Sequence, residues 1–324
     1  MEISLIDRYK GAMVGVHVGD AIGAPYEKAF TAKQIAVDIE ARGGLKFFDY
    51  PDPWVKKGQE PEMFPAGRPT DDSDQTADLA WSLIECDGLD TAHLREALCD
   101  SVVRGKSRLW NGVAKGAGGT TRKALSDDPA KVAAAMQNNI GTNGSLMRCV
   151  PLILLYSGLD NIDDAIDAMS AVTHTNEHSI EACSLYAEYL IATLAGWDRD
   201  EMFRRLEEEI NDTPKSFLKK RVVLSLADKN LFPIDPGAWP ARGTAEFSLY
   251  AALWCFKHST SFADGIERAV RIGGDTDTYA AIAGGLLGAY YGYNAIPLEQ
   301  RQSILGHGVM VDYAEKLYEL NQRK

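Results

Sequence analysis

Two acidic segments of the sequence carry residues that could do chemistry, and the first reads IGGDTDTY over residues 272–279. Asp275 and Asp277 lie two residues apart in this segment, beside the hydroxyls of Thr276 and Thr278. Carboxylates this close together repel each other and lose hydration when they are buried, unless a cation neutralises them. Because every donor is a hard oxygen atom, the segment suits magnesium or manganese better than zinc.

The second segment reads PTDDSDQ over residues 69–75, where Thr70 precedes Asp71 and Asp72. One or two six-coordinate cations need oxygen ligands from more than one segment, so the two segments together predict a shared metal site. The alternative is that these residues are helix N-caps, which is the commonest role of Thr, Asp and Ser before a helix. Capping needs one side chain for each helix, and so many candidates therefore favour a metal site.

Both segments are predicted to open helices, and a third helix leads to another acidic turn. An uncharged, glycine-containing run over 280–292 follows the first segment and is long enough for a buried helix. Apolar residues recur at helical spacing after the second segment, from Ala77 onward. Another helix is predicted over about Leu5–Val18, ahead of the segment GDAIGAPYE at 19–27, in which Pro25 stops any helix.

The turn after this helix carries two carboxylates whose roles the sequence leaves open. Asp20 is interpreted as a buried residue that accepts hydrogen bonds from backbone amides. Glu27 either reaches the metal site or is an ordinary acidic residue at a turn, and the local sequence favours the second. The proline-rich, aromatic stretch 46–69 is either an active-site lid or a packed surface loop.

Two glycine turns carry groups that could bind phosphate. Gly116, Gly118 and Gly119 precede a predicted helix start, where backbone amides bind anions, although glycine loops are more often linkers or tight turns. The second turn is NGSLMR, and its candidates are Asn143, Gly144, Ser145, Met147 and Arg148. Two glycine turns and an arginine would suit a pyrophosphate.

His174 and His178 lie four residues apart before a predicted helix. This spacing is compatible with a metal pair, but no third nitrogen or sulfur ligand is nearby in the sequence, so zinc is not expected. His174 is instead a candidate hydrogen-bond donor to a ligand phosphate. The alternative is a capping or core histidine, and the local sequence does not separate the two.

Composition limits the fold and the partners. The chain has 324 residues, of which 45% are hydrophobic, and a formal net charge of -12. The acidic balance argues against nucleic acid or an anionic membrane as the main partner. Alanine and leucine dominate and β-branched runs are short, which predicts an all-α fold. Since the acidic segments are expected to share one site, we expect one domain over residues 1–324.

Cysteine usage and the absence of targeting signals bear on the compartment. The five cysteines are scattered and form no CxxC pair, which predicts reduced thiols. The sequence shows no signal peptide and no unbroken apolar run of transmembrane length. We therefore expect a cytoplasmic protein, and we expect it to act as a monomer.

These motifs, in this order along nearly the whole chain, resemble those of the ADP-ribosylglycohydrolases, the family that includes the dinitrogenase reductase-activating glycohydrolase. GGDTDT at 273–278 is the most specific motif, while the segment around His174 is not specific. Ser73 stands where the family usually has threonine, and it keeps the hydroxyl. The further matching segments are 19–27, 70–73, 143–148 and 296–297.

The resemblance implies a compact, orthogonal all-α helical bundle with a centre of two magnesium or manganese ions. The implied metal ligands are Thr70, Asp71, Asp72, Asp275, Asp277 and Thr278. The implied reaction is hydrolysis of the bond between C1″ of ADP-ribose and an acceptor, such as an arginine side chain of a protein or a small conjugate. Glu27, Asp72 or Asp275 would supply the catalytic carboxylate, and the glycine turns with Arg148 would hold the pyrophosphate.

Two other classes of protein fit parts of this pattern. A binuclear metal hydrolase acting on phosphate esters would need the glycine turns but no ribose pocket. A non-catalytic relative, like the crystallin members of the family, would keep the fold alone, and the complete set of metal ligands argues against it. The acceptor linkage, the metal used and the general base stay open at this stage.

Overall fold

The computed structural model describes residues 3–27, 31–55, 58, 60–137, 140–212, 226 and 243–324. Almost all regular structure in these residues is helical, which confirms the all-α prediction. The helices, in order, are α1 Leu5–Gly23, η1 Ala24–Tyr26, α2 Ala32–Ala41, α3 Asp71–Glu85, α4 Thr91–Val102, α5 Gly119–Ala124, α6 Pro129–Met136, α7 Val150–Tyr156, α8 Ile162–Ala171, α9 Glu177–Leu194, α10 Arg199–Asp212, α12 Ala245–His258, α13 Phe262–Arg271, α14 Thr276–Tyr291, η2 Tyr293–Ala295, α15 Leu298–Ser303 and α16 His307–Asn321. The sequence predicts a solvated helix face at the basic stretch 219–221 and a loop at 232–240, and both segments lie outside the described residues.

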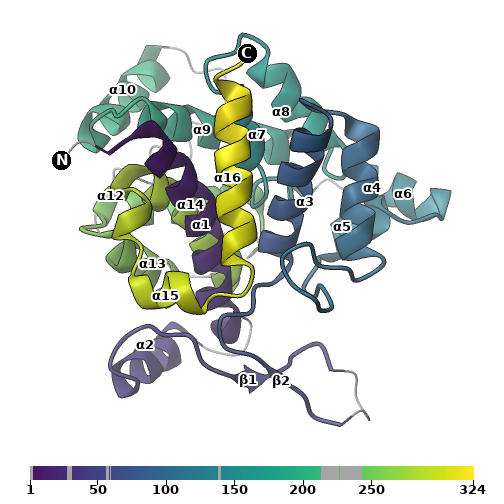
Figure 1. Ribbon diagram of the computed structural model, residues 1–324, viewed down its shortest axis with the longest axis vertical. Coiled ribbons are helices and arrows are strands. Elements are labelled where there is room, and N and C mark those ends of the chain that lie inside the picture. Colours follow the sequence, from purple (N-terminus) through teal and green to yellow (C-terminus); the bar gives the residue numbers. More distant parts are fainter. Residues whose placement is uncertain are drawn as a thin grey trace.

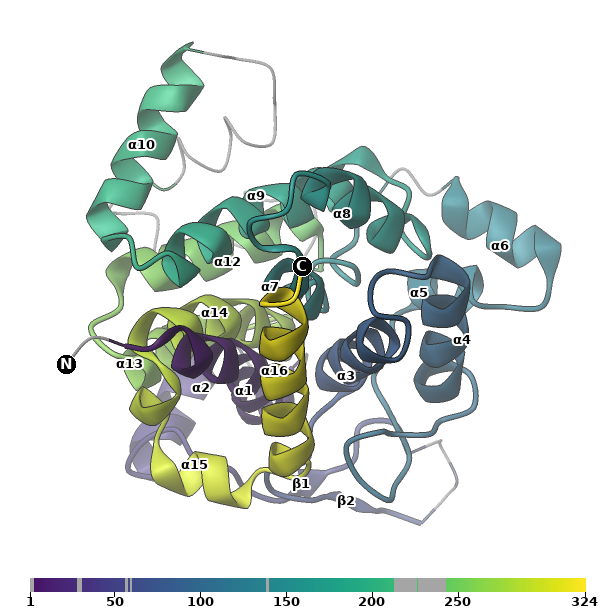
Figure 2. The same ribbon diagram turned by 45° about the horizontal axis from the view of Figure 1, so that its top comes forward.

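The centre of the molecule is the antiparallel pair α1 and α14, whose backbones touch (Figure 2). Glycines recur every fourth residue along the contact face of α1. A Cβ added to Gly11, Gly15 or Gly19 would lie 2.0 Å from a backbone carbonyl oxygen of α14. Only residues without a side chain allow this approach, because a real Cβ needs well over 3 Å from such an oxygen.

The same contact explains why α1 is longer than the sequence predicted. The helix was expected to end near Val18, but it continues to Gly23, and Pro25 then lies in the short helix η1. The glycines in its last turns are tolerated because α14 packs directly against them. Thr276 at the start of α14 donates to the Gly23 carbonyl at 2.8 Å, which brings the end of α1 to the beginning of α14.

Helix α16 crosses α1 on one side of this pair, and α3 packs beside α16, α1 and α14 (Figure 1). Helices α12 and α13 cover α14 from another side, and α7 and α9 close the core next to α3 and α14. No helix in the described part of the chain combines the length and the apolar character needed to cross a membrane.

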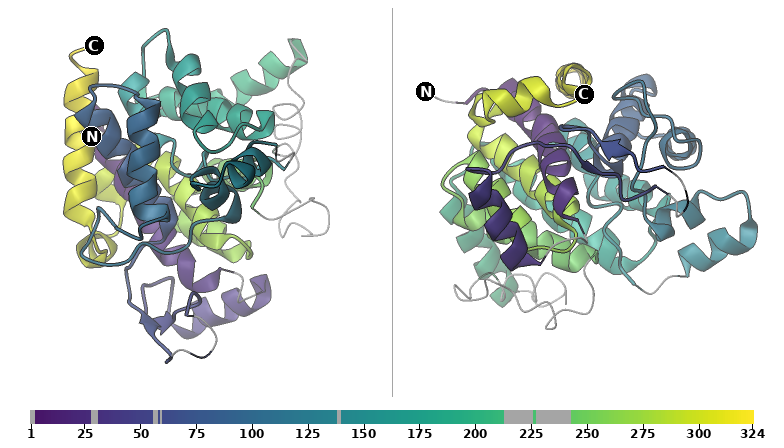
Figure 3. Two further views of the ribbon diagram at one scale, coloured as in Figure 1. Left: turned by 90° about the vertical axis from the view of Figure 1, so that its right-hand side faces the viewer. Right: turned by 90° about the horizontal axis from the view of Figure 1, so that it is seen from below.

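Helix α2 and a small hairpin lie together outside the central bundle, below it in Figure 1 and visible again in Figure 3. Strands β1 (Tyr50–Pro51) and β2 (Met63–Phe64) pair antiparallel in this hairpin. Its rings pack against each other, with centroids 5.0 Å apart for Tyr50 and Phe64 and 5.3 Å apart for Trp54 and Phe64. The described residues of the stretch 46–69 therefore pack against one another through their aromatic rings.

Candidate active site

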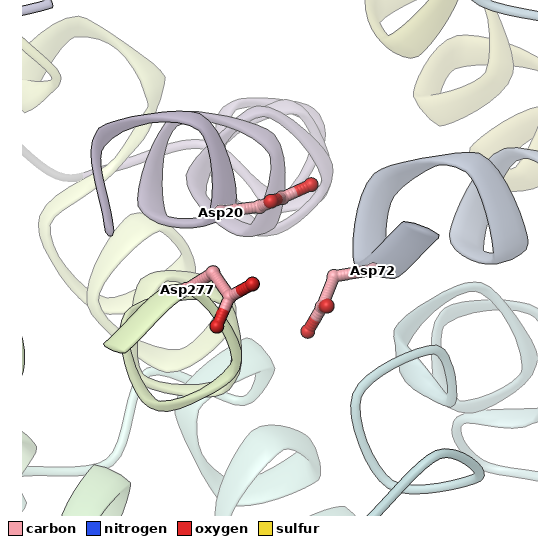
Figure 4. A group of neighbouring side chains, drawn as sticks. All are labelled: Asp20, Asp72 and Asp277. Atoms are coloured by element: carbon pink, nitrogen blue, oxygen red, sulfur yellow. The ribbon is translucent and has the colours of Figure 1, made fainter. Parts of the chain in front are cut away.

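Three helix ends converge at one place in the fold. The last turn of α1 supplies Asp20, the first turn of α3 supplies Asp72, and the first turn of α14 supplies Asp277. One carboxylate oxygen from each lies within 4.8 Å of the others. Figure 4 shows the three side chains coming from three different helices toward the space between them. Glu27, Asp275 and Asp277 form a second such group, so Asp277 belongs to both.

The residues at the N-cap positions of α3 and α14 do not act as caps. Among the described residues, neither Thr70 nor Asp275 makes a side-chain capping hydrogen bond to its helix. By comparison, the N-cap Asp90 of α4 accepts from the backbone amides of residues 92 and 93, both at 2.9 Å. The capping alternative therefore does not account for the two acidic segments.

Asp20 is a buried anchor between α1 and the start of α3. Its carboxylate accepts hydrogen bonds from four groups: the Thr70 amide at 3.0 Å, the Thr70 hydroxyl at 2.7 Å, the Ser73 amide at 3.0 Å and the Ser73 hydroxyl at 2.5 Å. Burial raises the pKa of Asp20, and these hydrogen bonds act in the opposite direction. The interpretation of Asp20 as an acceptor of backbone amides agrees with this geometry.

The other carboxylates of the cluster are costly to bury as anions. Burial, with the neighbouring negative charges, raises the pKa of Asp71, Asp72 and Asp277 well above the usual range. The Oδ1 atom of Asp72 is buried without a hydrogen-bond partner among the described residues. A divalent ion would relieve the mutual repulsion of these carboxylates and would coordinate the unpaired oxygen. Because every donor is an oxygen atom, these residues fit an ion that prefers oxygen ligands.

A cavity of about 450 Å³ opens beside the carboxylates. It brings together most of the residues that the sequence singled out, and its wall includes Glu27, Asp71, Asp72, Gly116, Gly118, Gly119, Asn143, Gly144, Met147, His174, Asp275, Asp277 and Thr278. Thr70, Ser145 and Arg148 are not among the described residues that line it. One part of the wall is therefore acidic, and the rest offers glycine backbone, threonine hydroxyls, an amide, a thioether and an imidazole.

The glycines of the first turn have two different roles. Gly116 has a φ of +120°, and a Cβ at that position would lie 2.3 Å from Oδ1 of Asp71. It thus leaves room for a carboxylate. A Cβ added to Gly118 or Gly119 would have no atom within 4 Å, and both residues line the cavity, so a side chain at either would narrow it.

The second turn packs under the imidazole of His174. A Cβ on Gly144 would lie 2.7 Å from Cε1 and 3.0 Å from Nε2 of that ring. Nδ1 of His174 lies 2.7 Å from the Thr173 hydroxyl. Burial, with the positive charge of Arg148, lowers the pKa of His174 to about 3, so the ring is neutral at physiological pH.

Arg148 is placed differently from the expectation that it would contact a pyrophosphate. It lies in the turn before α7, and it is fully buried. Its guanidinium is engaged by Gln75 and Thr173, at 2.9 Å and 2.6 Å. Ser145 is also buried, and its hydroxyl accepts from Ser170 at 2.9 Å. Both side chains turn inward because polar partners from α3, α8 and the following turn lie there.

Asn143 lines the cavity, but its amide is already used. Nδ2 donates to Oδ2 of Asp275 at 2.8 Å and to the Ser248 hydroxyl at 2.9 Å. Asn143 therefore orients one of the candidate metal ligands.

Several cavity residues were not predicted as site residues. They are Thr120, Thr121, Thr142, Gly243 and Gly274. Four of them lie in or next to predicted motifs: the two threonines follow the glycine loop, Thr142 precedes Asn143, and Gly274 lies inside GGDTDT. Their position beside a motif was the signal by which the sequence could have identified them. Gly243 lies far from every motif in the sequence and carried no such signal.

Comparison with known proteins identifies the family. The model of the ADP-ribosylglycohydrolase family matches residues 1–324. The chain belongs to this family. It is therefore a glycohydrolase, and the match confirms the resemblance drawn from the motifs.

Individual relatives are similar along almost the whole chain. The chain is 28% identical to ADP-ribosylarginine hydrolase Tri1 of Serratia proteamaculans (strain 568), over 98% of this chain and 80% of that protein. It is 25% identical to ADP-ribosylhydrolase ARH3 of Bos taurus, over 98% of this chain and 94% of that protein. A solved structure of an ADP-ribosylglycohydrolase-related protein complex matches with a TM-score of 0.71 and 29% identity, over 98% of this chain and 99% of the other.

Proposed function

We propose that this glycohydrolase cleaves the bond between C1″ of ADP-ribose and a modified acceptor, with an arginine side chain of a protein as the first candidate. The observation that carries the proposal is the cavity of about 450 Å³, whose lining combines a cluster of carboxylates with two glycine turns and a neutral histidine. Such a cavity has the size of a small-ligand site. The names of the relatives, an ADP-ribosylarginine hydrolase among them, favour this substrate class.

Two magnesium or manganese ions are proposed to bind the acidic wall. The residues that would hold them are Thr70, Asp71, Asp72, Asp275, Asp277 and Thr278. When bound, such ions lower the pKa of a coordinated water and hold substrate hydroxyls. Zinc is not favoured, because the cluster offers oxygen donors without nitrogen or sulfur.

The part of the cavity lined by the first glycine turn and His174 is proposed to hold the diphosphate of ADP-ribose. Gly118 and Gly119 leave their backbone accessible to a ligand because no side chain covers it. His174 is neutral and can donate one hydrogen bond without adding a charge.

A carboxylate next to the scissile bond is proposed to move the proton. Glycosidic bonds break through an oxocarbenium-like state, and a carboxylate can take a proton from the attacking water. Glu27 is our first candidate, because it lies in the cavity wall and one of its oxygens is within 4.8 Å of Asp275 and Asp277 oxygens. Asp72 and Asp275 are the other candidates. The catalytic unit is proposed to be one domain acting as a monomer in the cytoplasm.

The decisive experiment is a panel of mono-ADP-ribosylated acceptors with defined linkages, assayed with magnesium or manganese. The panel would contain arginine-linked, serine-linked and acyl-ester-linked ADP-ribose, with nitrophenyl phosphate as the control for phosphoester hydrolysis. Release of free ADP-ribose from the arginine-linked substrate is expected. Turnover of nitrophenyl phosphate without release of ADP-ribose from any member of the panel would reject the proposal.

A further inference from the structure

The buried Arg148 is not among the described residues that line the cavity, but one intervening side chain links it to each of two residues that do, Asp71 and His174. Its Nη1 donates to Oε1 of Gln75 at 2.9 Å, and Nε2 of Gln75 donates to Oδ2 of Asp71 at 2.6 Å. Its Nη2 donates to Oγ1 of Thr173 at 2.6 Å, and Oγ1 of Thr173 lies 2.7 Å from Nδ1 of His174. We propose that Arg148 is a positioning residue that orients Asp71 through Gln75 and selects the tautomer of His174 through Thr173.

We call the two hydrogen-bond paths from Arg148, through Thr173 to His174 and through Gln75 to Asp71, the first and the second arm. Donor and acceptor rules fix the direction of the hydrogen bonds in the first arm. An arginine has only donors, so the Thr173 oxygen accepts from it and still has its own hydrogen to donate. Within the described residues, the acceptor found for that hydrogen is Nδ1 of His174. If Nδ1 were protonated instead, the Thr173 oxygen would accept twice and its hydrogen would lack a partner in a fully buried site.

The proton of the neutral His174 ring is therefore on Nε2. This atom belongs to the edge of the ring that lies over Gly144, and both residues line the cavity. His174 is only 4% exposed, and no described residue is hydrogen-bonded to Nε2. The network thus presents one N–H donor to a ligand in the cavity, where the other tautomer would present a lone pair and repel an anionic oxygen.

The arm through Gln75 follows from the same rule. Because Arg148 can only donate, Gln75 turns its carbonyl oxygen toward Arg148 and its NH₂ group toward Asp71. A carboxylate held by a second residue keeps its orientation toward an ion, and losing such a partner typically weakens metal affinity about 10–100-fold. A planar guanidinium can hold both arms in fixed directions, which a lysine cannot do.

The test of the first arm is the tautomer of His174 in the full-length protein. Nitrogen NMR of selectively labelled histidine distinguishes a protonated from a bare ring nitrogen, and we expect the proton on Nε2. Thr173→Val keeps the shape of the side chain and removes the relay, so the single tautomer should be lost and ADP-ribose affinity should fall about tenfold. Thr173→Ser should restore both, while magnesium affinity should change little in either variant.

For the second arm, through Gln75, we expect magnesium affinity to change and the tautomer of His174 to stay the same. Gln75→Met should weaken magnesium binding in calorimetry about tenfold or more and leave the tautomer of His174 unchanged. Wild-type protein with its proton on Nδ1, or unchanged tautomer in Thr173→Val, would overturn the first arm. Unchanged magnesium affinity in Gln75→Met would overturn the second. If Thr173→Val does not fold, the wild-type tautomer alone decides.

The inference on ligand contact rests on the proposed function, but the two can fail separately. The tautomer and the magnesium affinity are measured without ADP-ribose and without turnover. A protein with the expected tautomer that does not bind ADP-ribose would reject the proposed function and leave the positioning role of Arg148 standing.

Discussion

Asp275 and Asp90 occupy the same N-cap position of their helices, yet their side chains have different surroundings. Asp90 accepts two backbone amides of α4. Asp275 makes no capping bond within the described residues and instead accepts from Asn143, in a group that contains Glu27 and Asp277. Equal positions in the helix thus correspond to different chemistry, and a pair of matched substitutions can separate the two.

We expect Asp90→Ala to lower the free energy of unfolding by about 1 kcal/mol and to retain turnover. We expect Asp275→Ala to leave the metal-free protein equally or more stable, because one of several repelling charges is removed. Turnover and the rise in melting temperature on addition of magnesium should both be lost. Thermal melts with and without magnesium, paired with a hydrolysis assay, measure this. Asp275→Ala behaving like Asp90→Ala in both measurements would return the residue to a capping role.

His17, which lies outside the carboxylate cluster, makes the free energy of unfolding depend on pH. Burial lowers the pKa of His17 to about 4, and its Nε2 lies 2.7 Å from the Leu305 carbonyl oxygen. A lowered folded-state pKa means that the unfolded chain takes up the proton first. The stabilisation by neutral His17 is therefore complete above pH ~6.5 and is lost as the pH falls toward 4.

The difference between wild type and His17→Gln isolates this term, because other titrating groups contribute to both proteins. Between pH ~6.5 and 4, wild type should lose roughly 3 kcal/mol relative to the variant, at about 1.4 kcal/mol for each pKa unit. Urea unfolding at several pH values measures the loss. Parallel pH profiles for the two proteins would show that His17 does not titrate across this range.

At the scale of elements, the contact between α1 and α14 decides where the acidic residues meet. Gly11 faces Gly288, Gly15 faces Gly284, Gly19 faces Ala280, and Gly23 faces Thr276. This antiparallel register places the last turn of α1 next to the first turn of α14. In the sequence of the first helix, four glycines follow one another at intervals of four residues. This spacing is the signal from which the pairing of α1 with another helix could have been predicted.

Gly15→Ala should destabilise the protein by roughly 1–3 kcal/mol or more, since a Cβ there would lie 2.0 Å from the Gly284 oxygen and force the helices apart. Gly308→Ala is the matched control on α16, because no atom lies within 4 Å of its Cβ position. The control should be neutral or stabilising by up to about 1 kcal/mol, from helix propensity alone. Equal melting temperatures for the two variants would contradict the close contact.

At the scale of the whole molecule, the fold brings several carboxylates from distant parts of the chain together at one buried site. Burial and mutual repulsion raise the pKa of Asp71, Asp72 and Asp277. The folded, metal-free protein therefore binds protons more readily than the unfolded chain. The contribution of these groups to stability falls as the pH rises from the unfolded pKa of about 4 to the higher folded values.

A bound divalent ion should reverse this dependence. Magnesium competes with protons for the carboxylates, so the rise in melting temperature that it causes should grow with pH. Differential scanning fluorimetry at several pH values, with magnesium or with chelator, measures the difference. A shift that is absent, or that does not depend on pH, would count against a metal site built from these carboxylates. Sodium at the same ionic strength is the control for charge screening.

The sequence by itself determined the helical class, the two acidic segments and the glycine turns, because each depends on local chemistry and helical periodicity. Asp71, Asp72, Asp275 and Asp277 were identified as a group because so many carboxylates beside helix starts exceed what capping needs. Their family followed from the same motifs. The single domain remains a prediction.

Only the tertiary structure decided which polar side chains line the cavity and which are buried behind its lining. Arg148 lies four residues after Gly144, which lines the cavity, yet its side chain turns inward to Gln75 and Thr173. Glu27 looked like an ordinary turn residue and reaches the carboxylates because α1 and α14 pair in one register. Side-chain direction depends on partners from distant parts of the chain, and the motifs that contain Glu27 and Arg148 do not include those partners.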